Sequence, residues 1–398
     1  MRAHAATLLL ALAAAAGASA AAYSIPSAPL KNAAVPGASM PFTGLGTGGY
    51  GHNASNPLAY PECWSDSAGC GAFVRNATAA YIRLAASIDP SSQVRIDNAN
   101  TYDDVDNVGL GMRDSGVPRE RIFLLSKTGS GQAMGYADTA AQIAAVLAQG
   151  GYAYVDALLV HWPTSTAPSQ DPACNAKDAA YNATACRLET WRAYVDAFKG
   201  GKALSIGVSN YHVAELQEIA DAGMPLPAIN QIPYHVYRSS SWAETVAWCL
   251  RNGVLVNAYS PYGAPDAHSY PTEGTGMAAS PLQDAVVLAV AAAHGRSPAA
   301  VISAWLRALG IVLNPRTYSA AHMADNLQAF DLCVRGRGQA PAAQPAAAHT
   351  RASPLSPPPP HTFCSRRVLT PAEISQLSSR PQDYCSIDPN WYECVQGA

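Results

Sequence analysis

Eight short apolar runs, separated by segments with helical periodicity, restrict the fold of this 398-residue chain more than any other feature. The runs cover residues 43–46, 94–96, 122–126, 157–160, 204–208, 227–231, 254–260 and 311–315. Most of them are continuously apolar and do not alternate polar with apolar residues. This pattern is typical of strands whose sheet is covered on both faces. We therefore expect an eight-stranded sheet that is buried on both sides.

Helical patterns fill most gaps between these runs, near residues 77–88, 104–115, 137–149, 187–199, 212–222, 240–252 and 297–309. A helix between successive strands favours parallel pairing through right-handed crossovers. Repeated eight times, the unit favours a closed (β/α)8 barrel, the TIM barrel, over an open sheet. We predict a single α/β domain of this kind over residues 38–333.

Four other segments fall outside the repeat. Residues 52–76 and 163–186 each hold a cysteine pair in polar sequence and are predicted to be surface insertions. Residues 334–362 are rich in proline and alanine and cannot bury a core, so they are predicted to be a disordered low-complexity linker. Residues 363–398 are predicted to form a short capped helix, near 368–379, and a disulfide-stapled tail.

The N-terminal residues have the pattern of a cleavable signal. Arg2 and His4 precede an apolar run, and the small residues Ala18–Ala20 follow it. The apolar run is too short for a comfortable bilayer crossing, and no later segment is long enough, so no membrane span is predicted. We predict a signal peptide over residues 1–20 and a protein of the secretory pathway or the extracellular space. A transit peptide to an organelle is the alternative.

Cysteine spacing and glycosylation motifs favour the same compartment. The close cysteine pairs are Cys63/Cys70, Cys174/Cys186 and Cys385/Cys394, and the N-x-[ST] motifs begin at Asn53, Asn76 and Asn182. Local pairs of this kind suit disulfides in an oxidising compartment, and such motifs accept glycans there. We predict a disulfide-bonded glycoprotein. No cysteine or histidine spacing makes a convincing zinc site, so no metal is predicted.

Charge limits the partners. Lysine and arginine number 25 against 28 acidic residues, giving a net charge of −3. The chain has no basic patch that would attract nucleic acid, and none is expected as a partner. We expect a monomer that acts on a small molecule.

The residues just beyond the predicted strands are the candidates for chemistry, because sites on such barrels gather at the carboxyl ends of the strands. Asp97 follows the second run, Lys127 the third and His161 the fourth. Ser209-Asn210, Gln231 and Tyr259 occupy similar positions further along the chain. A purely structural barrel needs no ionisable groups at three successive strand ends.

Asp97, Tyr102, Lys127 and His161 form a chemically coherent set. A tyrosine titrates near pKa 10, and a nearby ammonium lowers that pKa toward the working range. A carboxylate keeps the ammonium charged, and a histidine can hold a carbonyl oxygen by hydrogen bonding. The set suits a carbonyl group that receives hydride on carbon and a proton on oxygen. Nothing in it supplies the hydride, so a nicotinamide cofactor is implied.

The sequence resembles the aldo-keto reductases. The similarity runs through residues 40–51, 95–129, 155–163, 206–211, 229–235, 256–263 and 314–331, in the order in which the family has these motifs. It implies that Tyr102 is the proton donor, that Asp97 and Lys127 tune it, and that His161 orients the carbonyl. It also implies an NADP-dependent oxidoreductase barrel that binds its dinucleotide without a Rossmann fold.

The same resemblance implies a cofactor site. Its members here are Ser209, Asn210, Gln231, Tyr259, Ser260, Arg316, Thr317, His322, Asp325 and Asn326. The first three match residues that hold the nicotinamide carboxamide, and Tyr259 matches the aromatic residue stacked on the ring. Arg316-Thr317 stands where the family has Lys-Ser on the 2′-phosphate, and arginine keeps that positive charge. We expect NADP(H) in preference to NAD(H), held less tightly because His322 replaces a second arginine.

Several positions depart from the family pattern. Gly48 and Gly129 stand where the family often has tryptophans, which leaves Trp162 and Tyr50 as the aromatic candidates for the substrate wall. The residues after Tyr102 read Asp-Asp-Val where the family commonly has x-Asn-Glu, so the local support of the tyrosine differs.

The sequence therefore predicts an NAD(P)H-dependent reductase of aldehydes or ketones to alcohols. Hydride would pass from nicotinamide C4 to the carbonyl carbon, and the proton would come from Tyr102. The alternative is a catalytically inactive barrel of the secretory pathway that binds a carbohydrate or a protein.

Overall fold

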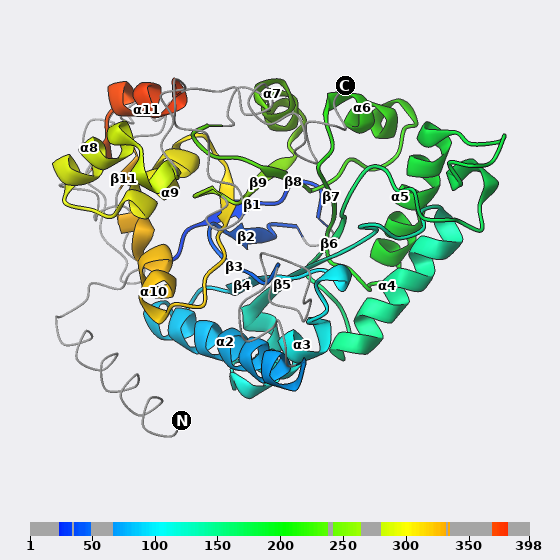
Figure 1. Cartoon of the computed structure of the whole chain (residues 1–398), viewed down its shortest axis with the longest axis horizontal. Helices are drawn as coiled ribbons and strands as arrows, with labels where there is room; N and C mark the ends of the chain where they lie inside the picture. Colours follow the sequence, from blue (N-terminus) through cyan, green and yellow to red (C-terminus); the bar gives the residue numbers. More distant parts are fainter. Residues whose placement is uncertain are drawn as a thin grey trace, which may run out of the picture.

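The computed structural model describes residues 24–33, 36–48, 67–237, 242–263, 280–331, 333–334 and 368–380. Its centre is a sheet of eight parallel strands in the order β10-β9-β8-β7-β6-β5-β4-β3 (Figure 1). They are β3 (Leu45–Gly46), β4 (Val94–Asp97), β5 (Ile122–Thr128), β6 (Ala157–Val160), β7 (Ile206–Ser209), β8 (Ile229–Pro233), β9 (Leu255–Tyr259) and β10 (Val312–Asn314). Each strand pairs with its sequence neighbour, as right-handed strand–helix repeats require.

A parallel bridge between Thr43 and Leu313 joins the first strand region to the last. The amide of Leu313 donates to Phe42 O at 2.9 Å, and the amide of Gly46 donates to Pro315 O at 2.9 Å. Because these bonds join the two edges of the sheet, the eight strands close into a barrel. The prediction of a (β/α)8 barrel is confirmed.

Helices surround the barrel (Figure 1). They are α2 (Ser67–Ile88), α3 (Val105–Asp114), α4 (Tyr136–Gly150), α5 (Ala183–Lys199), α6 (Val213–Asp221), α7 (Ala243–Asn252), α8 (Ala285–His294), α9 (Pro298–Ala308) and α10 (Ala320–Gln328). All residues of β4, β5, β6, β7 and β8 are buried, since helices cover one face and barrel side chains the other. This explains why the strands read as continuous apolar runs.

Two helical predictions needed correction. The helix expected over residues 77–88 begins at Ser67, so the last ten residues of the segment predicted as an insertion, 52–76, are helical. Helix α8 was not predicted, because its sequence of alanine and valine is apolar on every side and shows no amphipathic period.

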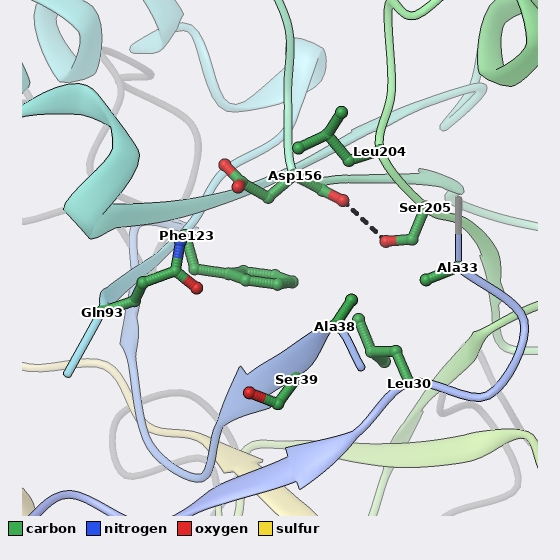
Figure 2. Close-up of a pocket in the computed structure, with 9 residues that line it drawn as sticks. All are labelled: Leu30, Ala33, Ala38, Ser39, Gln93, Phe123, Asp156, Leu204 and Ser205. Atoms are coloured by element: carbon green, nitrogen blue, oxygen red, sulfur yellow. Dashed lines mark hydrogen bonds between the residues drawn. The ribbon is translucent and has the colours of Figure 1, made fainter. Parts of the chain in front are cut away.

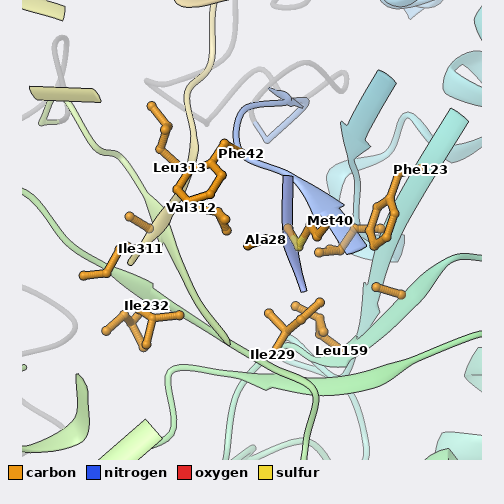
Figure 3. Close-up of a cluster of buried hydrophobic side chains, with 14 of the residues drawn as sticks. Ala28, Met40, Phe42, Phe123, Leu159, Ile229, Ile232, Ile311, Val312 and Leu313 are labelled. Atoms are coloured by element: carbon orange, nitrogen blue, oxygen red, sulfur yellow. The ribbon is translucent and has the colours of Figure 1, made fainter. Parts of the chain in front are cut away.

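A short hairpin closes the amino-terminal end of the barrel. Strands β1 (Ser27–Pro29) and β2 (Ser39–Pro41) pair antiparallel, with Ala28 opposite Met40. Both side chains are buried at 5% and 0% exposure and lie in an apolar cluster with Phe123, Leu159 and Ile229 (Figure 3). The hairpin therefore fills the end of the barrel that lies opposite the carboxyl ends of the strands.

A cavity of about 180 Å³ lies beside this hairpin. Leu30 and Ala38 face Phe123, Leu204 and Ser205 across it (Figure 2). Phe123 and Leu204 lie at or before the starts of their strands, so the cavity is at the amino-terminal end. Chemistry on such barrels collects at the opposite end, and we assign the cavity to packing.

The segment after β6, predicted as an insertion over residues 163–186, is structured and tied to its surroundings. A disulfide joins Cys174 to Cys186 across a sequence separation of 12. The carboxylate of Asp138, in the first turn of α4, accepts bonds from Ser169 Oγ at 2.8 Å and Gln170 N at 3.0 Å. The predicted Cys174/Cys186 pair is confirmed. Cys63, Cys385 and Cys394 lie outside the described residues, while Cys70 is disulfide-bonded and Cys249 is a buried free thiol.

The C-terminal helix predicted near residues 368–379 is α11 (Pro371–Ser378). Thr370 and Glu373 form a capping box at its start, and its buried Leu377 packs toward α8 and α9. Before it, β12 (Val368–Leu369) pairs in parallel with β11 (Cys333–Val334). Residues 335–362 of the predicted linker lie outside the described residues, as do residues 1–20 of the predicted signal peptide.

Among the described helices, none is by itself long and apolar enough to cross a bilayer. Helices α8 and α9 reach that length only together, and a bend of 95° separates them.

Candidate active site

Three strand ends bring the predicted catalytic residues together. Asp97 is the last residue of β4, Lys127 is the penultimate residue of β5, and His161 directly follows β6. Because these strands are parallel neighbours, their carboxyl ends meet at one mouth of the barrel. The amide of His161 also donates to Thr128 O at 2.8 Å, which continues the ladder and fixes the backbone of the histidine.

A buried ion pair forms the base of this site. The ammonium of Lys127 bonds to Asp97 Oδ1, and the two side chains are 0% and 1% exposed. Lys127 Nζ also donates to Asn98 O at 3.0 Å, and Gln231 Nε2 donates to Asp97 Oδ2 at 2.6 Å. Burial lowers the pKa of Lys127, but Asp97 and Tyr102 outweigh burial and hold that pKa above its ordinary value. The lysine is therefore charged.

Tyr102 reaches the ion pair from the link after β4. It ends a short 3-10 turn, Asn100–Tyr102, and the next residue, Asp103, has a left-handed φ of 55°. This reversal brings the Tyr102 hydroxyl to 3.4 Å from Lys127 Nζ. Burial raises the pKa of Tyr102, nearby carboxylates add to the rise, and the charge and hydrogen bond of Lys127 offset only part of it. The phenol is therefore protonated at neutral pH, and the predicted net lowering of its pKa is not seen.

His161 packs against Tyr102. The ring centroids lie 5.6 Å apart at 78°, an edge-to-face arrangement. The His161 side chain is buried, and its Nδ1 has no hydrogen-bond partner among the described atoms. Burial, and then the charge of Lys127, lower the pKa of His161 well below its usual value. The imidazole is therefore neutral and can act as a hydrogen-bonding group.

The predicted carboxamide residues form one hydrogen-bonded group beside these four. Ser209 Oγ donates to Gln231 O at 2.8 Å and accepts from Asn210 Nδ2 at 3.2 Å. Asn210 Nδ2 also donates to His161 O at 3.0 Å, and the Tyr259 hydroxyl donates to Asn210 Oδ1 at 3.1 Å. Tyr259 is half-buried at the end of β9. The residues predicted to hold and stack on a nicotinamide ring thus adjoin the residues predicted to act on the carbonyl.

Residues with unusual backbone conformation surround the same mouth. Among the described residues, the non-glycine positions with positive φ are Asp103 at 55°, Asn210 at 62° and Ser260 at 46°. They follow the ends of β4, β7 and β9. Such conformations cost of order 1–3 kcal/mol each and concentrate at functional sites. The local sequence does not predict these conformations, except that Asp and Asn tolerate positive φ better than most residues.

The residues predicted to hold the adenosine end lie along and after β10. Arg316 is half-buried, and its Nη1 donates to Gly48 O at 2.9 Å. Thr317 Oγ1 lies 3.5 Å from Nδ1 of the exposed His322, at the start of α10. This end therefore presents one arginine and one imidazole to a phosphate.

Asp325 and Asn326 are engaged within the protein. Asp325 Oδ2 accepts from Ser297 Oγ at 2.7 Å, and Asn326 Oδ1 accepts from the Tyr262 hydroxyl at 3.1 Å. Asn326 is buried and Asp325 is half-buried. Asp325 is therefore the more accessible of the two side chains.

The two glycines that replace family tryptophans differ in their surroundings. A Cβ added to Gly48 would lie 3.2 Å from Cζ of Tyr102, so the Tyr102 ring packs directly against this glycine. At Gly129 no described atom lies within 4 Å of such a Cβ. Trp162 is half-buried next to His161, and Tyr50 lies outside the described residues. Open space therefore adjoins Gly129 among the described residues, whereas the Tyr102 ring lies against Gly48.

Three residues behind the ion pair were not among the predicted site residues. Thr47 donates its amide to Asp97 O at 2.9 Å, Asn98 offers its carbonyl to Lys127, and Asp104 accepts from the Asn98 side chain at 2.5 Å. All three are fully buried. Their position could have indicated them, because each is a polar residue close to the end of a buried strand or to Tyr102.

The described residues bring together no group of three or more histidine, cysteine, aspartate or glutamate side chains that could hold a metal ion. The mouth fits a nicotinamide dinucleotide better. It offers a half-buried tyrosine ring, a cluster of amide and hydroxyl groups beside it, and a half-buried guanidinium further along.

Comparison with known proteins places the chain in a family. The model of the aldo/keto reductase family matches residues 74–334. Morphine 6-dehydrogenase of Pseudomonas putida is 31% identical over 266 residues, which cover 67% of this chain and 82% of that protein. Glyoxal reductase of Bacillus subtilis is 30% identical over 236 residues, covering 59% of this chain and 72% of that protein.

Solved structures agree on the fold. An aldo-keto reductase complexed with NADPH superposes with a TM-score of 0.62 at 22% identity, covering 90% of this chain and 88% of that one. A Bombyx mori aldo-keto reductase in complex with NADP gives a TM-score of 0.62 at 21% identity, with 94% and 99% covered. From the match of the family model and the related sequences, we conclude that the chain belongs to the aldo/keto reductase family of NADP-dependent oxidoreductases.

Proposed function

We propose that this protein reduces aldehydes or ketones to alcohols with NADPH and that Tyr102 supplies the proton. The observation that carries the proposal is the position of the Tyr102 hydroxyl, 3.4 Å from an ammonium that is itself held by a buried carboxylate. Family membership supports carbonyl reduction in general, and the comparisons lend no support to an inactive binding module.

Each of the four side chains has its own role in the reaction at the carbonyl oxygen. His161, neutral because it is buried, donates a hydrogen bond that orients and polarises the carbonyl. Tyr102, protonated at neutral pH, transfers its proton to the oxygen as negative charge develops there. Lys127 then stabilises the phenolate that remains, and Asp97 keeps Lys127 charged and correctly placed.

The cofactor residues serve the same centre. When bound, NADPH supplies the hydride that adds to the carbonyl carbon, from C4 of its nicotinamide ring. Ser209, Asn210 and Gln231 would hold the carboxamide of that ring, and Tyr259 would stack on it so that one face meets the substrate. Ser260 would lie on the pyrophosphate side, and Arg316 with Thr317 would meet the 2′-phosphate.

A substrate panel of small aromatic aldehydes tests the proposal. The wild-type protein should oxidise NADPH in the presence of these aldehydes and show a thermal shift with NADPH alone. Tyr102→Phe should retain the thermal shift and lose the turnover. A protein that shows neither turnover nor a shift with any nicotinamide nucleotide would refute the proposal.

We also propose that the chain matures in the secretory pathway. The Cys174–Cys186 disulfide and the disulfide-bonded Cys70 support an oxidising compartment, and Asn76 and Asn182 are both exposed where a glycan could attach. The mass of the mature chain, measured before and after glycosidase treatment and reduction, tests this. Cleavage after Ala20, a glycan and paired cysteines are expected. An unprocessed, glycan-free chain with all thiols reduced would rule it out.

A further inference from the structure

Asp104 occupies a position that its sequence context does not explain. It is the residue before α3, where an aspartate usually accepts bonds from the first helical amides. Its side chain makes no such bond. The left-handed turn at Asp103 instead places the carboxyl group of Asp104 in the interior, where it is 0% exposed.

The partners of Asp104 are neutral. Asn98 Nδ2 donates to Asp104 Oδ1 at 2.5 Å and also to Thr47 Oγ1 at 2.9 Å. The Thr47 hydroxyl lies within hydrogen-bonding reach of the same carboxyl group. Within the described part of the chain, Asp104 forms no ion pair, and its second oxygen has no hydrogen-bond partner.

The charged and titratable groups that face Asp104 do not neutralise it. They are Lys127 on β5, Tyr102 and Asp103 on its own link, and Tyr152 beyond α4. The one cation among them, Lys127, is already bonded to Asp97, to Asn98 O and to Tyr102.

Burying a carboxylate without a cation beside it costs much free energy, and the group ordinarily takes up a proton instead. Burial raises the pKa of Asp104 well above its usual value, and the bonds from Thr47 and Asn98 and the charge of Lys127 offset only part of this. A proton also removes the negative charge from a group whose second oxygen has no hydrogen-bond partner, which lowers the cost of burying it.

Asn98 connects Asp104 to the proposed catalytic ion pair. The Asn98 carbonyl accepts from Lys127 Nζ at 3.0 Å, while its side chain bonds to Asp104 and Thr47. Thr47 in turn donates its amide to Asp97 O at 2.9 Å. Thr47, Asn98 and Asp104 thus hold, from behind, the backbone that places both charges of the ion pair.

We propose that Asp104 is a neutral carboxylic acid that acts as a positioning residue, fixing Asn98 and through it the ammonium of Lys127 beside Tyr102. This inference rests on the proposed carbonyl reduction for its effect on rate, but not for the protonation of Asp104. Its neutrality matters to the reaction, since a negative charge at Asp104 would raise the pKa of Tyr102 and oppose proton release.

Infrared spectroscopy tests the protonation. The difference spectrum between wild type and Asp104→Asn at neutral pH should contain the carbonyl stretch of a protonated carboxylic acid. Asp103→Asn is the matched control, because Asp103 is the exposed neighbour and its difference spectrum should lack that band. A carboxylate signal lost from Asp104→Asn, with no protonated-acid band, would overturn the proposal.

Kinetics test the positioning. Asp104→Ala removes one of the two partners of the Asn98 amide, and kcat for aldehyde reduction should fall roughly tenfold while the Kd for NADPH stays within about twofold. Asp104→Asn, which keeps an acceptor of the same shape, should restore kcat and leave the pH profile unchanged. If Asp104 were ionised, Asp104→Asn would instead move the alkaline limb to lower pH. An unchanged kcat in Asp104→Ala would also overturn the proposal.

The two proposals fail in different ways. Wild-type protein without any NADPH-dependent turnover would remove the proposed function and with it the effect of Asp104 on rate. The infrared comparison would still decide whether Asp104 carries a proton.

Discussion

The Tyr102 hydroxyl lies 3.4 Å from Nζ of Lys127, and that nitrogen also lies 5.1 Å from the centre of the Tyr102 ring. The ammonium is thus placed to favour the phenolate once the proton has left, while burial keeps the proton on the hydroxyl beforehand. This balance suits a group that must hold a proton at neutral pH and release it only as the carbonyl oxygen becomes basic.

Tyr102→Phe should lower kcat for aldehyde reduction by roughly 100-fold or more, the usual contribution of a positioned general acid. The Kd for NADPH, measured by fluorescence quenching, should change little because the hydroxyl is not among the proposed cofactor contacts. Tyr136→Phe is the control, since this exposed hydroxyl bonds to Asp196 on the outside of the barrel. Equal activity of the two variants would contradict the role of Tyr102.

Lys127→Met should abolish turnover and destabilise the fold, because it leaves Asp97 buried without its cation. Breaking such a pair costs about 3–5 kcal/mol of unfolding free energy. The double variant Asp97→Asn/Lys127→Met removes both charges and should recover much of the stability in urea denaturation, but no activity. Recovery of turnover in the double variant would show that the ion pair is structural only.

The pH profile of reduction should decline only on its alkaline side. The reaction needs Tyr102 protonated, and its raised pKa places the loss of activity at alkaline pH. The pKa of His161 is lowered well below its usual value, so its imidazole stays neutral and adds no acidic limb near neutrality. Nitrogen-15 NMR of the His161 ring checks this directly. A ring that titrates between about pH 6 and 8 would contradict the assignment.

Arg316→Gln should raise the Kd for NADPH roughly 10- to 100-fold, since a charge-assisted hydrogen bond contributes about 1.5–3 kcal/mol. The Kd for NADH, which has no 2′-phosphate, should change far less. His322→Arg should instead lower the Kd for NADPH several-fold, because it adds a guanidinium. The exposed Arg192→Gln on α5 is the control. Equal effects on both nucleotides would place Arg316 away from the phosphate.

Replacing Cys174 and Cys186 together by alanine should lower the free energy of unfolding by about 2–3 kcal/mol, as expected for a short cross-linked loop. Because Cys70 is also disulfide-bonded, reductant should destabilise both proteins, but the wild type by a similar amount more than the double variant, as measured by thermal unfolding. If reductant changed both proteins equally, the stabilisation would belong to another cysteine pair.

The strands were the most predictable part of the fold. Burial on both faces demands uninterrupted apolar sequence, so Ala157–Val160 was predicted with its observed bounds. Helix α2 was predicted too short because Gly69 and Gly71 have poor helix propensity. Both glycines are nevertheless helical in the fold. A Cβ at Gly71 would lie 3.0 Å from the Asn107 side chain of α3, so a small residue suits this contact. Close packing of the two helices therefore outweighs local preference.

The sequence allowed the residues of the candidate site to be predicted, but not the direction in which their pKa values shift. Asp97, Lys127 and His161 follow from the rule that strand ends meet at one mouth, which needs no coordinates. The sequence could not show that burial and nearby carboxylates together outweigh Lys127 in setting the pKa of Tyr102. Nor could it distinguish Asp104 from an ordinary helix cap, because the turn at Asp103 that directs it inward is a backbone property.

The bridge between Thr43 and Leu313 has a consequence for synthesis. The barrel and its mouth are complete only when the last strand returns to the first, and the bond between Arg316 and Gly48 spans 268 residues of sequence. A nascent chain that stops before β10 would leave β3 and β9 as open edges, which invite pairing with other chains. Premature termination should thus yield aggregates that chaperones must clear, and no partially active enzyme.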